Sequence, residues 1–89
     1  MAEVLLSDVA QDAVAVSLAR AVVTANRRAR ELGVDVDQSL ISITQDGAPS
    51  AVIWRINYGP QDYVGRRGGD VLIEVDSEQA RIRRVLRGQ

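Results

Sequence analysis

The feature that most constrains the fold is an alanine-rich run, residues 7–32, in which apolar side chains recur every three or four positions. This spacing predicts one long amphipathic helix, because these positions fall on a single helical face. Ser7 can cap its start, and Gly33 can take the left-handed conformation that ends a helix. Because small side chains let backbones approach closely, we expect the helix to lie against a sheet. Any bend in the helix is expected at residues 22–24, because β-branched residues are weak helix formers.

Four segments after the helix are predicted to be strands: residues 38–45, 51–58, 70–76 and 80–86. Their side chains alternate between apolar and polar, which is typical of a sheet with one covered face. The Asp46-Gly47 pair indicates a hairpin turn between the first two strands. In the last strand Arg84 falls among the apolar positions, which favours a bulge or an edge strand. The fold class is therefore α+β: one long N-terminal helix packed on a four-stranded antiparallel β-meander, as a single domain over residues 1–89.

The inward-facing positions of the helix and strands define the expected core. Trp54, the only tryptophan, is expected to pack against the alanine stripe of the helix. The other expected core residues are Val14, Leu18, Ala21, Val22, Ala25, Ile41, Ile43, Val52, Ile56, Val71, Ile73, Val75 and Ile82.

The chain has 89 residues, and neither cysteine nor histidine occurs among them. The commonest metal ligands and the commonest general base are therefore both missing. Several aspartates fall at the ends of elements, where this residue is favoured for local hydrogen bonding. We therefore expect a protein that is not an enzyme and that carries no cofactor and no metal.

The charge balance also restricts the class of partner. The net charge is −1, with eleven basic residues, all arginine, against twelve acidic ones. Nucleic-acid-binding domains usually carry a basic excess, so this balance argues against nucleic acid as the partner. No run is long and apolar enough for a membrane span, and residues 1–6 lack the pattern of a signal peptide. We expect a cytoplasmic protein with no membrane partner.

The sheet face that points away from the helix is the candidate partner-binding surface. It combines aliphatic side chains with a predicted cross-strand charge ladder in which Arg55 and Glu74 are joined by either Arg81 or Arg83. Aliphatic side chains grouped on an open sheet indicate a contact surface. The candidate residues are Leu40, Ile53, Arg55, Leu72, Glu74, Arg81, Arg83 and Val85. We expect a protein partner here, and a homodimer formed through this outer face.

A second candidate site lies in the glycine-rich segment 59–69, which contains four glycines and one proline. This composition predicts an irregular loop. Backbone amides beside arginines can hold a phosphate or an acidic peptide, which makes Arg66, Arg67, Gly68 and Gly69 a candidate anion or partner loop. Since no helix is predicted after it, the segment matches neither a P-loop nor a dinucleotide fingerprint, and a plain strand connection is the alternative.

The C-terminal part of the chain resembles known families. Residues 68–76 (GGDVLIEVD), Ala80 and residues 85–89 (VLRGQ) look like the closing hairpin of PepSY and cystatin-like domains. They are similar as well to small bacterial immunity-type proteins with a nuclear-transport-factor-like fold. Such hairpins usually carry glycine where this chain has Ala80, and a positive φ there would cost alanine about 1 kcal/mol. The resemblance implies a binding or inhibitory module and transfers no functional residue.

The sequence therefore predicts a non-catalytic protein-interaction or inhibitory module. One alternative is a bacterial immunity or inhibitor protein that acts against a toxin or a peptidase through the outer face and residues 66–69. Another is a weak RNA-binding module, because Arg81, Arg83, Arg84 and Arg87 make the last strand basic.

Overall fold

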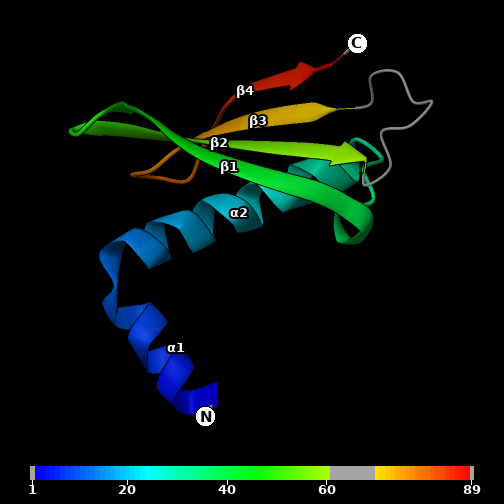
Figure 1. Ribbon diagram of the computed structural model, residues 1–89. Helices are drawn as coiled ribbons and strands as arrows, with labels where there is room; N and C mark the ends of the chain where they lie inside the picture. Colours follow the sequence, from blue (N-terminus) through cyan, green and yellow to red (C-terminus); the bar gives the residue numbers. More distant parts are fainter. Residues whose placement is uncertain (1, 61–69, 89) are drawn as a thin grey trace.

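The computed structural model describes residues 2–60 and 70–88, and side-chain surroundings for 7–60 and 70–88. The elements are α1 (Ala2–Gln11), α2 (Ala13–Glu31), a 3₁₀ turn η1 (Val36–Gln38), β1 (Ser39–Ala48), β2 (Ala51–Pro60), β3 (Val71–Asp76) and β4 (Ile82–Arg87). The strands form one antiparallel sheet in the order β1-β2-β3-β4, and α2 lies along one face of it (Figure 1). The predicted α+β fold of a long helix on a four-stranded meander is confirmed. None of the described helices is long and apolar enough to cross a bilayer.

The predicted single helix from Ser7 is interrupted at Asp12, which separates α1 from α2. Asp12 has an extended backbone, and its carboxylate accepts the N–H of Ala15 at 2.9 Å. Aspartate is a strong N-cap because it satisfies an unpaired N–H and places negative charge at the positive end of the helix dipole. Ser7 therefore lies inside α1, and the chain changes direction at Asp12 instead of at residues 22–24. As a result α1 points away from the sheet (Figure 1).

The C-terminal end of α2 follows the prediction. Gly33 has φ +88°, and its N–H bonds to the carbonyl of Arg30 at 3.0 Å. The N–H of Val34 bonds to the carbonyl of Ala29 at 2.9 Å. These two bonds are the Schellman pattern, which satisfies carbonyls that the helix leaves unpaired.

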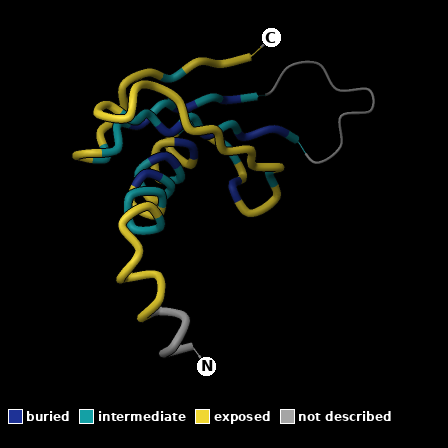
Figure 2. The backbone as a smooth tube through the Cα atoms, turned by 60° about the vertical axis from the view of Figure 1, so that its left-hand side comes forward, coloured by how far each residue is buried: buried dark blue, intermediate teal, exposed yellow. Residues whose placement is uncertain are grey.

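The core lies between α2 and the two middle strands, as the buried segments in Figure 2 show. Trp54 is buried, and its Nε1–H donates to Oγ of Ser17 on α2 at 3.0 Å, so its predicted place against the helix is confirmed. The buried hydrophobic residues are Ala21, Ala25, Ala29, Val36, Trp54, Ile56, Tyr58, Val71, Ile73 and Val75.

Four predicted core residues are exposed instead: Val14 (61%), Ile41 (38%), Ile43 (42%) and Ile82 (36%). The last three lie on the edge strands β1 and β4. A helix is about 10 Å in diameter and strands are about 4.8 Å apart, so one helix covers roughly two strands. α2 covers β2 and β3, and the side of β1 that faces the helix layer remains accessible to solvent.

The last hairpin contains the bulge that Arg84 suggested. Glu74 is opposite Arg84 but Val75 is opposite Ile82, so Arg83 is an extra residue on β4. Beyond the bulge, Val85 is opposite Ile73 and packs against the core. The expectation that Val85 points outward is therefore wrong, because the extra residue reverses the alternation of side chains.

Two residues near the hairpin turns, Gly47 and Ala80, have a positive φ. Asp46 and Gly47 were expected to form the first hairpin turn, but both lie within β1, and the turn is at residues 49–50. Gly47 nevertheless has φ +90°. Ala80, between β3 and β4, has φ 53°, which is the positive value that a glycine would favour at this place.

Candidate protein-interaction surfaces

The centre of the outer face carries a charge ladder across three strands. Arg55 on β2 is opposite Glu74 on β3, which is opposite Arg84 on β4. Oε2 of Glu74 lies 3.2 Å from Nε of Arg55 and 3.1 Å from Nη2 of Arg84. The predicted pair Arg55–Glu74 is confirmed, but the third member is Arg84, because the bulge moves Arg83 out of register.

The two arginines of the ladder neutralise the negative charge of Glu74. The Glu74 side chain is only 13% exposed, and two guanidinium groups share its carboxylate. Asp46 on β1 extends the row, with Oδ2 at 4.0 Å from Nη1 of Arg55. A partner that covers this part of the face would therefore meet charges already paired within the chain.

Leucines lie toward one end of the outer face. Leu72 on β3 is opposite Leu86 on β4, and Leu40 on β1 is opposite Gly59, which has no side chain to cover it. Leu40 and Leu86 are exposed, and Leu72 is half-buried. Leu86 was not predicted here, since the alternation of side chains alone, without the bulge, placed it on the opposite face.

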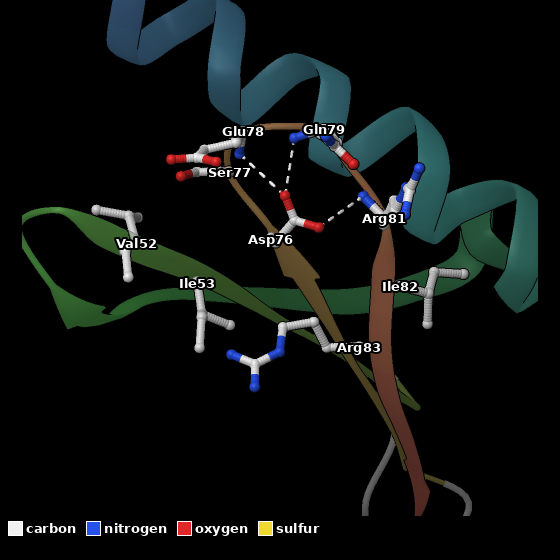
Figure 3. Close-up of a pocket in the computed structure, with 10 residues that line it drawn as sticks. Val52, Ile53, Asp76, Ser77, Glu78, Gln79, Arg81, Ile82 and Arg83 are labelled. Carbon is white, nitrogen blue, oxygen red and sulfur yellow. Dashed lines mark hydrogen bonds between the residues drawn. The ribbon is translucent and has the colours of Figure 1, made fainter.

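A groove of about 500 Å³ occupies the other end, between the start of β2 and the β3–β4 turn (Figure 3). The carboxylate of Asp76 holds this turn by accepting the backbone N–H groups of Glu78, Gln79 and Arg81 at 3.0, 2.8 and 3.3 Å. Asp76 is therefore a structural residue. The side chains available to a ligand include Ile53 and two arginines, Arg81 and Arg83.

The structure thus divides the predicted partner-binding residues into groups. Ile53, Arg81 and Arg83 line the groove, Arg55 and Glu74 form the ladder, Leu40 and Leu72 lie toward the leucine end, and Val85 faces the core. Among the residues that the structure describes, no acidic group lies within 4 Å of the guanidinium of Arg81 or Arg83. The predicted loop residues Arg66, Arg67, Gly68 and Gly69 lie outside the described residues.

A second surface, which the sequence did not identify, is the strand β1 itself. Ile41 and Ile43 point to the helix side but are exposed, and among the strands that the structure describes β1 pairs only with β2. The alternation of side chains showed which way these isoleucines point. It could not show that α2 is too narrow to cover them.

Tyr58 is a titratable residue that is buried in the core. Burial raises the pKa of Tyr58 to about 12, although the nearby Arg30 acts to lower it. The Tyr58 hydroxyl donates to Oδ1 of Asn26 at 2.6 Å, so this tyrosine ties β2 to α2. Within residues 7–60 and 70–88, no three acidic side chains come together in a way that could hold a metal ion. The chain matches no protein-family model, no curated protein and no solved structure.

Proposed function

We propose that this protein is a non-catalytic protein-interaction module and that the outer face of its sheet binds the partner. The observation that carries the proposal is the exposure of large aliphatic side chains on a small sheet. Leu40 and Leu86 are exposed on the outer face, and Ile53 and Leu72 are half-buried there. Single exposed apolar residues are common, but several of them on one small sheet are typical of a surface that is covered in a complex.

The groove supports a partner of defined chemistry. Arg81 and Arg83 place two guanidinium groups beside the aliphatic side chain of Ile53. Guanidinium groups bind carboxylates through directed, charge-assisted hydrogen bonds. The geometry therefore favours a protein segment that presents an acidic side chain next to an apolar one.

Two narrower forms of this proposal follow from the sequence. The partner is a second copy in the predicted outer-face homodimer, or it is a toxin or peptidase that the protein inhibits. Ile53→Glu tests the homodimer, because it replaces an aliphatic side chain of the groove on this face with a charged one. A dimer formed there would dissociate, as measured by sedimentation equilibrium.

The general proposal is tested with the immobilised protein and extract from its native cells. We expect the wild-type chain to retain a specific protein, and the double variant Arg81→Glu, Arg83→Glu to retain at least tenfold less of it. Arg27→Glu is the matched control, because Arg27 is an exposed arginine on α2 and does not line the groove. Titration of the purified partner by calorimetry then measures the dissociation constants. Equal retention by the wild-type chain and the groove variant would contradict the proposal.

A further inference from the structure

We infer that the free edge of β1 pairs antiparallel with β1 of a second copy, so that the two sheets join into one continuous sheet. This inference goes beyond the outer-face proposal, because it uses the edge of the sheet instead of its face. The evidence is the direction of the backbone groups of β1, the residues along its edge, and the accessible surface of the chain.

The backbone groups of alternate β1 residues point to the free edge. The carbonyl of Val52 accepts the N–H of Ser77 at 3.1 Å, so the backbone groups of Val52 face β3. Its partner on β1 is Gly47, whose backbone groups must then face away from β2. The register of β1 and β2 is continuous from Ser39↔Pro60 to Ala48↔Ala51. Ile41 and Ile43 therefore direct their N–H and C=O groups to the same edge.

Residues 39–45 of this edge, which the structure describes, carry none of the features that usually prevent strands from pairing. Residues 39–45 (SLISITQ) contain no charge and no proline, and the ladder with β2 shows no bulge. Proteins usually protect exposed edges with charges, prolines or bulges, whereas uncharged, β-branched segments pair readily. An identical strand is a suitable occupant, because pairing two uncharged segments brings no like charges together.

One register suits the side chains best. With a two-fold axis through Ser42, Ile41 of each copy is opposite Ile43 of the other, and the four isoleucines meet on the helix side. With the axis through Ile43 instead, Ile41 would be opposite Gln45. The first register places the apolar pairs together, so we assign the axis to Ser42.

The accessible surface of the chain is larger than that of a compact monomer. It amounts to 6303 Å², whereas a compact monomer of 9.7 kDa would expose about 5,100 Å². Both α1, which points away from the sheet (Figure 1), and the exposed isoleucines of β1 contribute to the excess of roughly 1,200 Å², and a second copy at β1 would cover the isoleucine part of it. The radius of gyration is 14.2 Å, against about 12 Å for a compact chain of this length.

Single cysteines test the register directly, because the chain has none of its own. In the assigned dimer the two Ser42 residues form a non-hydrogen-bonded pair, with Cα atoms about 4.5 Å apart, which suits a disulfide. Ser42→Cys should therefore form a cross-linked dimer on mild oxidation. Thr44→Cys is the matched control on the same strand and face. Its two copies would lie about 13 Å apart along the strands, so it should cross-link at least tenfold more slowly.

The outcomes separate this inference from the outer-face proposal. Dimeric wild-type protein in sedimentation equilibrium and cross-linking of Ser42→Cys but not Thr44→Cys would support the edge pairing. A monomer, or equal cross-linking of both variants, would overturn it and would leave the groove experiment unaffected. A dimer that Ile53→Glu dissociates, with no Ser42→Cys cross-link, would also overturn it and would assign dimerisation to the outer face.

Discussion

The two edge strands of the sheet are built in opposite ways. β4 has six residues, three of which are arginines, and its pairing with β3 is interrupted by a bulge. β1 has ten residues, carries no charge before Asp46, and pairs with β2 without interruption. Charges and bulges are the features that stop an edge from pairing with another strand. The difference indicates that β4 is a closed edge and β1 an open one.

The comparison also shows how one helix distributes burial over four strands. α2 buries the apolar side of β2 and β3, and β4 contributes half-buried Val85 to the same core. β1 has isoleucines on the same side, yet both are exposed. An apolar side chain on the helix side of this sheet is therefore buried only where the helix reaches it.

The largest expected effect measures this uneven burial. Ile73 on β3 is fully buried and Ile43 on β1 is 42% exposed, although both face the helix side. Ile73→Ala should lower the free energy of unfolding by about 3 to 4 kcal/mol, because it leaves a cavity in the core. Ile43→Ala should cost about 1 kcal/mol, because its side chain is partly in water already. Urea unfolding followed by circular dichroism, at dilutions that keep the chain monomeric, checks both values. Equal losses would show that β1 is covered as well as β3.

The next effect concerns Tyr58, the buried neighbour of exposed Ile41 across β1 and β2. Burial raises its pKa from 10.0 to about 12, so the folded chain holds this proton more tightly than the unfolded chain. The stabilisation is complete below pH 10 and is lost as the pH rises toward 12, by on the order of 2 to 3 kcal/mol. Urea unfolding at pH 9, 10 and 11 measures the first part of this loss, which should reach about 1.4 kcal/mol at pH 11. Tyr58→Phe is the control and should remove most of this pH dependence. An unchanged slope in Tyr58→Phe would show that another group titrates.

The end of β1, next to the turn at residues 49–50, depends on the glycine at position 47. A Cβ at this position would overlap the carbonyl oxygen of Ala51, and the backbone has φ +90°. Gly47→Ala should cost about 2 kcal/mol, from backbone strain and from displacement of that carbonyl. Gly33→Ala is the matched control, because Gly33 has φ +88° with no atom within 4 Å of a Cβ. It should cost about 1 kcal/mol, also measured by urea unfolding. Equal losses would mean that the hairpin adjusts without cost.

Much of this fold could be predicted from the sequence, because it depends on local patterns. Alternation gave the four strands and their apolar faces, and Gly33 marked the end of α2. The residues whose positions were predicted wrongly depend on more than local sequence patterns. At Asp12 the chain can either continue the first helix or cap a new one. The spacing of the apolar residues alone does not decide between the two. The reversal at Val85 follows from one extra residue at Arg83, and the exposure of Ile43 follows from the width of the helix.

The candidate site shows the same division. The pair Arg55–Glu74 was predicted because both residues face outward on neighbouring strands. Their register is fixed by the core residues that flank them along β2 and β3. The groove was not predicted as a cavity, since it forms where the β3–β4 turn folds back over Asp76. The edge of β1 was not recognised as a surface, because the sequence does not show that α2 leaves the isoleucines of this strand uncovered.

The smallest expected effect concerns the closed edge, at Arg84. This arginine binds Glu74 at 3.1 Å but is 57% exposed, so water and salt screen the ion pair. Arg84→Thr should therefore lower the free energy of unfolding by only about 0.5 kcal/mol, since Arg55 remains beside the carboxylate. The loss should shrink in 0.5 M sodium chloride, whereas Arg87→Thr, an exposed arginine of the same strand, should show little change at either salt concentration. A loss above 2 kcal/mol would mean that Glu74 depends on Arg84 alone. In that case β4 is held in place mainly by its charge, and the bulge contributes less to closing this edge than its geometry indicates.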